Sequence, residues 1–221
     1  MALVKSMLFI DGENLTMRFQ AMQAASRKPL PNVIHVVDEF VWSPLPQRAI
    51  VDTDVIRINY YTSKVGDDDA VSALKQTIAS NWYFMSGDVL GPCQMHPRVY
   101  KKPQKSHKSR LVDINIAIDV MRYAYTNAID VVYIFSGDGD FVNLIEEVGR
   151  SGRRVCVAAF TSGLDPRLRV ASDRFVELDN YYFERPSIAG QPSVEVIKQP
   201  AHTVDNPPVV EPQAPKGPAS P

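Results

Sequence analysis

Four aspartates in this sequence stand where a carboxylate could take part in chemistry. Asp11 follows a short apolar run, Asp113 opens a helical pattern, and Asp138 and Asp140 lie one residue apart in SGDGDF, directly after an apolar strand pattern. If the four converge, mutual repulsion makes it costly to ionise them all unless a cation lies among them. Clustered carboxylate oxygens suit hard cations. The pattern therefore predicts a site for Mg²⁺ or Mn²⁺.

A phosphodiester is the substrate that such a site suits. The metal can ionise an attacking water, neutralise the phosphoryl oxygens and stabilise the leaving oxygen, with one ion or two. Because four aspartates contribute to the predicted site, the prediction is more specific than one based on a lone DxD motif.

Each aspartate also has a purely structural interpretation, and these stay open at this point. Asp140 could be the N-cap of a helix over 141–150. Asp113 could be a first-turn acid stabilised by the helix dipole, and Asp11 could lie in a turn with the glycine that follows it. Asp138, between two glycines, is the hardest to explain in this way.

The helical pattern over 111–126 gives a prediction about two of its acids. At 100° per residue, Asp113 lies on the same side as Ala117, Val120 and Ala124, and we expect it to project from the apolar face. Asp119 falls on the opposite side, and we expect it to be solvated.

Strand and helix patterns alternate along the chain. Because the strands are apolar throughout, we predict an α/β fold with a parallel sheet sandwiched by helices and a ligand site beyond the carboxyl ends of the strands. The segment 25–54 breaks the alternation and is interpreted as an insertion with its own strand pair. The predicted strands are 7–10, 55–62, 131–135, 154–160 and 174–178, and the predicted helices are 13–23, 67–82, 111–126, 141–150 and a short turn at 166–171.

Composition limits the classes of protein to consider. The 221 residues carry a formal net charge of −1, so overall charge predicts neither nucleic-acid nor membrane binding. Two cysteines form no disulfide framework, and no stretch approaches a membrane span, so we expect a cytoplasmic protein. The last 36 residues hold nine of the 17 prolines. We predict one folded domain over 1–185 and a disordered tail over 186–221 that could recruit a protein partner.

A basic segment leads directly into the helix that carries Asp113. The segment 98–110 contains six cations and no acid, and we interpret it as a loop that binds RNA phosphates, with nearby aromatic residues available to stack on bases. A solvated charged loop is the alternative. The six cations are Arg98, Lys101, Lys102, Lys105, Lys108 and Arg110.

Three motifs resemble one known family. "LFIDGENL", "VDINIAIDV" and "SGDGDF", the last followed by "ASDRFVEL", are similar to the NYN domain, in the LabA-like branch of the PIN-like ribonuclease superfamily. The resemblance covers most of 7–178, with 25–54 and 83–107 outside it. It implies a PIN-like (Rossmann-like) fold, a divalent-metal site and activity on RNA. By motif, Asp11, Asp113, Asp138 and Asp140 match the acidic positions, with Asn14 and Ser136 in supporting roles.

The sequence departs from the family in one place. Family members often carry KGVD before the helix, whereas this chain has KSRLVD, and Lys108 or Arg110 could take the place of that lysine.

Two functions follow as hypotheses. The first is a metal-dependent ribonuclease acting on single-stranded or structured RNA. The second is a non-catalytic RNA-binding or regulatory module that recruits partners through its tail. A Toprim-like domain would need a Glu where this chain has Asp11, and a HAD-type phosphatase would need a DxD after the first strand. A homo-oligomer is compatible with the sequence, which does not fix the oligomeric state.

Overall fold

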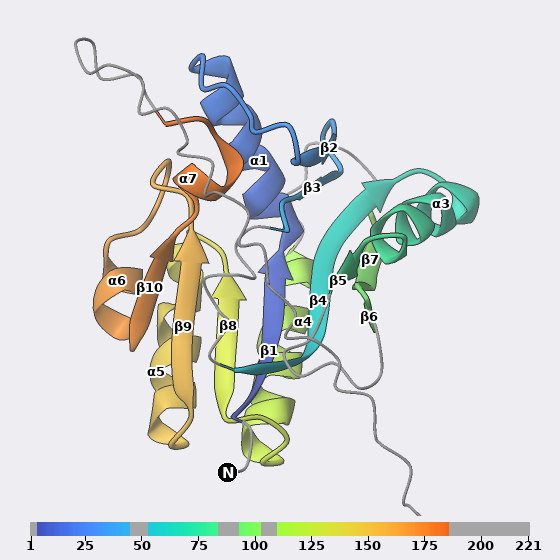
Figure 1. Ribbon diagram of the computed structural model, residues 1–221. Helices are drawn as coiled ribbons and strands as arrows, with labels where there is room; N and C mark the ends of the chain where they lie inside the picture. The colour runs from blue at the N-terminus through green and yellow to red at the C-terminus, as the bar shows by residue number, and fades with distance from the viewer. Residues whose placement is uncertain (1–3, 45–52, 84–92, 103–109, 186–221) are drawn as a thin grey trace, which may run out of the picture. The chain divides into compact units, whose positions relative to one another are not determined.

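The computed structural model describes residues 4–44, 53–83, 93–102 and 110–185. Its centre is a six-stranded, all-parallel sheet in the order β10-β9-β8-β1-β4-β7 (Figure 1). The predicted α/β fold with a parallel sheet is therefore confirmed. The strands are β1 (Lys5–Asp11), β4 (Asp54–Val65), β7 (His96–Lys102), β8 (Val131–Phe135), β9 (Arg154–Ala159) and β10 (Arg174–Glu177).

Helices cover both faces of the sheet. The first face packs against α1 (Gly12–Ala24), α3 (Asp68–Ala79) and α7 (Asp179–Tyr182). The second face packs against α4 (Arg110–Tyr125), α5 (Val142–Arg150) and α6 (Arg167–Ala171). Side chains alternate between the two faces along each strand: Leu8 and Ile10 belong to the first core, and Met7 and Phe9 to the second.

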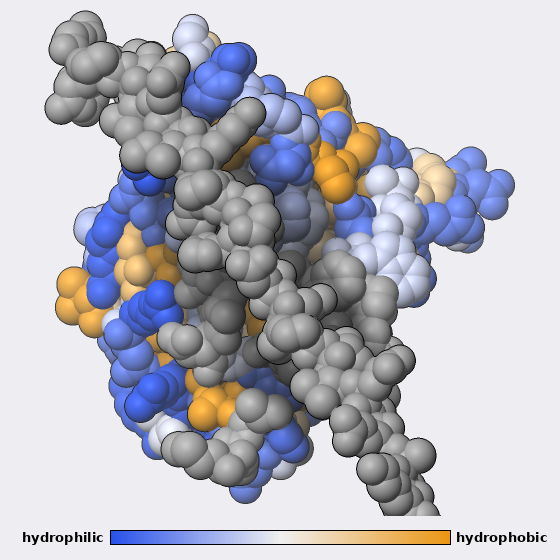
Figure 2. All heavy atoms as spheres, viewed as in Figure 1, coloured by the Kyte–Doolittle hydropathy of each residue, from blue (hydrophilic) through white to orange (hydrophobic). Residues whose placement is uncertain are grey.

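The insertion predicted at 25–54 does contain its own strand pair. β2 (Ile34–Val36) and β3 (Phe40–Trp42) form an antiparallel hairpin. All of β3 is buried and packs into the core under α1, whereas Ile34 and Val37 are exposed. Figure 2 shows the resulting apolar surface over the hairpin. The hairpin of the insertion is therefore part of the folded core.

The interpretation of 98–110 as a basic loop is wrong for its first five residues. They belong to β7, which pairs with β4 and forms an edge of the sheet, with Val99 buried in the core. Lysines and arginines are common on such edges because they discourage pairing with another chain. A second short pair, β5 (Trp82–Tyr83) and β6 (Cys93–Gln94), precedes β7.

The prediction for Asp119 is also wrong. Asp119 is 8% exposed; it accepts a hydrogen bond from the Tyr61 hydroxyl at 2.9 Å and one from Arg122 at 2.7 Å. The buried face of α4 is centred near Ile116, so it is rotated around the helix axis toward Asp119 relative to the face assumed in the sequence analysis. That rotation brings Asp119 inward and leaves Asp113 half-buried at the edge of the same face.

Two predictions concern regions outside this description. Lys105 and Lys108 lie outside the described residues, and so does the proline-rich segment 186–221. No helix in the described part of the chain is both long and apolar enough to cross a bilayer.

Candidate active site

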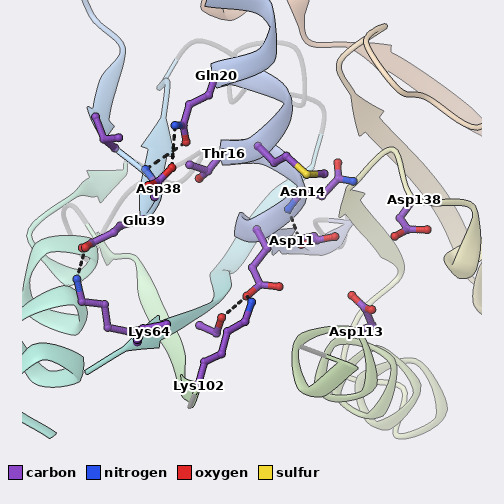
Figure 3. Close-up of a pocket in the computed structure, with 15 residues that line it drawn as sticks. Asp11, Asn14, Thr16, Gln20, Asp38, Glu39, Lys64, Lys102, Asp113 and Asp138 are labelled. Atoms are coloured by element: carbon purple, nitrogen blue, oxygen red, sulfur yellow. Dashed lines mark hydrogen bonds and ion pairs between the residues drawn. The ribbon is translucent and has the colours of Figure 1, made fainter. Parts of the chain in front are cut away.

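A cleft of about 770 Å³ opens at the carboxyl ends of the central strands (Figure 3). Three of the four predicted carboxylates line it: Asp11 from the end of β1, Asp113 from the first turn of α4, and Asp138 from the loop after β8. Asp11 and Asp138 come together because β1 and β8 are parallel neighbours that end at the same edge of the sheet, and Asp113 joins them from α4. In Figure 3, Asp113 and Asp138 face each other, with Asp11 beside them at the start of α1.

Asp11 is the most buried of these acids, with 3% of its surface exposed. Its Oδ1 accepts the backbone N–H of Asn14 at 3.0 Å, which caps α1, and its Oδ2 accepts the Ser136 hydroxyl at 2.9 Å. Burial raises the pKa of Asp11 from 3.8 to about 7; the two hydrogen bonds oppose this, and the negative charges of Asp113 and Glu13 add to it. The two hydrogen bonds only partly offset the cost of burying the ionised carboxylate of Asp11. A cation bound beside Asp11 would stabilise that ionised form.

The SGDGDF loop is held in place by a chain of hydrogen bonds. The Ser136 hydroxyl accepts the N–H of Asp138 at 3.1 Å, and Asn14 Oδ1 accepts the N–H of Gly137 at 3.1 Å. Asp138 in turn accepts the N–H of Asp140 at 3.0 Å and caps the 3₁₀ turn η1 (Gly139–Phe141). Asn14 and Ser136 thus connect the start of α1 to the loop that carries Asp138.

The N-cap interpretation of Asp140 is wrong. α5 begins at Val142 after Phe141, with no side-chain cap, and the capping carboxylate in this region is that of Asp138. Asp140 is exposed and does not line the main cleft. It lines a smaller adjoining pocket with Arg110, Asp113 and Ile114. Asp113 therefore borders both spaces, with Asp140 on its outer side.

Comparison with known proteins agrees with this geometry. The NYN domain matches residues 5–179. The chain belongs to the NYN domain family. NYN domains have a PIN-like, nuclease-type fold; they generally bind RNA, and nucleases of this kind generally use divalent metals. The match runs through both segments, 25–54 and 83–107, that lie outside the motif resemblance.

A solved structure supports the fold independently. A protein of unknown function from Vibrio parahaemolyticus RIMD 2210633 superposes with a TM-score of 0.55 and 18% sequence identity. The match covers 82% of this chain and 97% of that one. At this level of identity the similarity concerns the fold alone. No curated protein matches the chain.

The acids of the NYN domain suit a divalent cation, although they do not form a closed ligand set. Among the described residues, no three Asp, Glu, His or Cys side chains are arranged to hold one ion together. Mg²⁺ usually keeps several waters and binds through one or two carboxylates plus the phosphates of its substrate. An open arrangement of Asp11, Asp113 and Asp138 around one cleft fits that mode of binding.

The predicted RNA-binding cations are dispersed in the structure. Lys102 is the one that lines the cleft within the described part of the chain; its side chain is 14% exposed and lies 3.5 Å from Glu13. Lys101 pairs with Asp68 at 2.8 Å, outside the cleft. Arg98 lies 4.0 Å from Asp119. Arg110 borders only the smaller pocket.

Several residues at the site were not identified from the sequence. Glu13, Gln20 and Lys64 line the cleft, and Arg18 packs against Gly163 in the loop after β9. That loop contacts the SGDGDF loop, with a hydrogen bond of 3.1 Å from the Asp165 N–H to the Gly137 carbonyl. Glu13 lies within the DGEN motif, which was a usable signal; the others depend on contacts between distant segments.

Proposed function

We propose that this NYN domain is a divalent-metal-dependent ribonuclease of the LabA-like branch, acting on RNA in the cytoplasm. The observation that carries the proposal is the convergence of Asp11, Asp113 and Asp138 on one cleft from three separate elements. Structural roles alone account for parts of this arrangement, such as the capping by Asp11 and Asp138. They give no reason for all three carboxylates to share one solvent-filled space, where they repel one another.

The residues of the cleft have distinct proposed roles. A divalent cation bound there would polarise a phosphoryl oxygen and lower the pKa of an attacking water. Asp11, Asp113 and Asp138 would hold the cation. Asp140, which lines the adjoining pocket with Asp113, would help to orient it. Asn14 and Ser136 fix the positions of Asp11 and Asp138 through the hydrogen bonds described above.

Lys102 is the proposed cleft contact to an RNA phosphate. It stands at the end of β7, its ammonium group lies against Glu13, and both line the same cleft as the three acids. We propose that the remaining five cations of 98–110 (Arg98, Lys101, Lys105, Lys108 and Arg110) contribute to RNA binding through long-range attraction.

A second function is favoured by one observation. Because Asp11 caps α1 and Asp138 caps η1, this arrangement of carboxylates would also serve a domain that binds RNA without cutting it. In this alternative the domain is a regulatory RNA-binding module, and the segment 186–221 recruits a protein partner.

The test is an incubation of purified protein with labelled single-stranded RNA and DNA in EDTA, Mg²⁺ or Mn²⁺. Asp138→Asn is the informative variant, because an Asn side-chain oxygen can still accept the Asp140 N–H and preserve the loop. Asp69→Asn, which changes an exposed acid of α3, is the matched control.

We expect metal-dependent cleavage of RNA by the wild type and by Asp69→Asn, and a loss of at least about 100-fold in Asp138→Asn. Cleavage that survives equally in EDTA, or in the Asp138 variant, would contradict the proposed site. If neither the wild type nor the variant cuts RNA but both retard it on a gel, the binding-module alternative is correct.

A further inference from the structure

Helix α4 is apolar on two opposite faces. Its inner face packs on the sheet through Val112, Ile116 and Val120. On its outer face a second row of large apolar side chains runs the whole length of the helix. This row, the outer stripe, consists of Leu111, Ile114, Ile118, Met121 and Tyr125. A helix that is apolar all round is normally buried all round, so we expect another element to cover the outer stripe.

The outer stripe is open to solvent in the single chain. Leu111 and Ile114 are each 51% exposed. Ile118 is 47% exposed and Tyr125 is 53% exposed, while Met121 is half-buried. Single exposed apolar side chains are ordinary, but this contiguous row amounts to a patch on the order of 400 Å², a size that marks interaction sites.

The spacing of the outer stripe fits a second helix. Successive members are three, four, three and four residues apart, which is the repeat of the a and d positions in a coiled coil. At 100° per residue the row is about 80° wide, narrower than the face with which a helix covers a sheet. A narrow seam of this kind packs its side chains between those of one facing helix.

The side of the outer stripe next to α5 is acidic. The Tyr125 hydroxyl donates a hydrogen bond to Glu147 of α5 at 2.5 Å, so Glu147 lies beside the last turn of α4. The side chains of Glu146 and Glu147 are 49% and 41% exposed, and Arg150 forms ion pairs with both. Two acids therefore share one cation on this side.

The opposite side of the outer stripe is basic. Asp119 points away from α5, where it accepts a hydrogen bond from the Tyr61 hydroxyl of β4. Arg122 and Arg98 both pair with Asp119, at 2.7 and 4.0 Å, and their side chains are 61% and 42% exposed. Two cations therefore share one mostly buried acid on this side, the reverse of the balance next to α5.

We propose that the outer stripe is the interface of a symmetric dimer, in which α4 packs in parallel against α4 of a second copy of the chain. With the two-fold axis along the helices, each outer stripe packs against itself, and the acidic side of one chain meets the basic side of the other. Arg122 and Glu147 both lie near the last turn of α4, so the opposite charges meet at the same level. An antiparallel dimer would place acidic side on acidic side.

The size of the surface suits this partner. A standard interface covers about 800 Å² on each chain, with an apolar centre and a polar rim. The outer stripe supplies about half of that area as the centre, and the charged flanks supply the rim. Because the two flanks complement each other, a second copy satisfies both at once.

The interface borders the candidate active site. Ile114 belongs to the outer stripe, and together with Arg110 it lines the smaller pocket that also contains Asp113 and Asp140. In a parallel dimer the first turns of the two α4 helices lie at the same end. The dimer therefore places two candidate sites side by side.

The first test is the mass of the full chain in solution. Sedimentation equilibrium covers about 1 to 100 µM, since the average mass of a reversible dimer rises with concentration. We expect the wild type to approach twice the mass of one chain. Ile118→Asp buries a charge from each copy at the centre of the interface, and we expect the dissociation constant to rise at least about 100-fold.

Val170→Asp is the matched control, because Val170 is 88% exposed on α6 and lies outside the outer stripe. It should keep the wild-type dissociation constant. Both substitutions are at exposed positions, so both variants should retain the circular dichroism spectrum of the wild type.

Disulfide cross-linking tests the identity and direction of the partner. Leu111→Cys and Ile118→Cys are compared under mild oxidation in a background with Cys93→Ser, since Cys156 is buried. In the parallel dimer each position lies opposite itself, and we expect both variants to form covalent dimers. Val170→Cys should form none.

Three results would overturn the proposal. The first is a wild type that stays monomeric at the highest concentration, and the second is a dimer of unchanged strength in Ile118→Asp. The third is cross-linking at position 118 without cross-linking at position 111, which would indicate antiparallel helices. None of these measurements involves RNA or metal, so their outcome is separate from that of the ribonuclease test.

Discussion

Asp11→Asn tests the electrostatics of the cleft through protein stability. Burial raises the pKa of Asp11 from 3.8 to about 7 in the folded chain. Between these values the unfolded chain ionises the group while the folded chain keeps it protonated. Folding therefore loses stability as pH rises through this window, and the loss is constant above it. At about 1.4 kcal/mol per pKa unit, the full loss is about 4 kcal/mol.

The substitution removes the charge while largely preserving the hydrogen bonds. The Asn side-chain oxygen can accept the Asn14 N–H, and the Ser136 hydroxyl can turn to accept from the new amide. We expect the variant to gain stability over the wild type as pH rises. Its advantage in the free energy of unfolding should be about 2–3 kcal/mol larger at pH 8 than at pH 5.

The measurement is urea unfolding of both proteins in EDTA at pH 5, 6.5 and 8. Asp69→Asn controls for the loss of one negative charge from the surface. Adding Mg²⁺ at pH 8 should stabilise the wild type more than Asp11→Asn, since a ligand that binds the folded state raises its stability. A difference between wild type and variant that is the same at all three pH values would refute the reasoning, because a buried acid with this pKa cannot produce it.

Three further predictions follow from the structure. Ser136→Ala removes the hydroxyl that joins Asp11 to the next loop, and we expect RNA cleavage to fall at least about 10-fold and the free energy of unfolding to fall by about 1 kcal/mol in urea titrations. A Cβ at Gly149, inside α5, meets no atom within 4 Å, so Gly149→Ala should raise the free energy of unfolding by about 0.5–1 kcal/mol in urea titrations. Lys102→Ala should weaken RNA binding and flatten its dependence on salt concentration more than Lys101→Ala does, because only Lys102 lines the cleft; equal effects in anisotropy titrations would contradict the assigned position.

The main features of the fold were predictable because they depend on local patterns. Continuous apolar runs identified β1, β8 and β9, and the rule that parallel strands end at one edge predicted that Asp11 and Asp138 would meet. The strand pair within 25–54 was also confirmed.

The failures share a physical cause, since each depended on packing between distant segments. The charged residues of β7 looked like a loop because the pattern does not reveal that Val99 packs beneath α3 at the edge of the sheet. Asp119 looked solvated because its partner, Tyr61, comes from β4, 58 positions earlier in the chain. A small error in the centre of the buried face of α4 was enough to misplace it.

The sequence by itself determined five of the six strands of the main sheet, the family, and the candidate aspartates, because these follow from residue type and short-range spacing. Only the tertiary structure decided which of them share a cleft. It brought Asp113 beside Asp11 and Asp138 and left Asp140 on the outer side. It also placed the hairpin turn, through Gln20 and Asp38, at the far end of the same space. These arrangements depend on how α4 and the hairpin pack on the sheet, and such packing is set by the fit of many distant side chains at once.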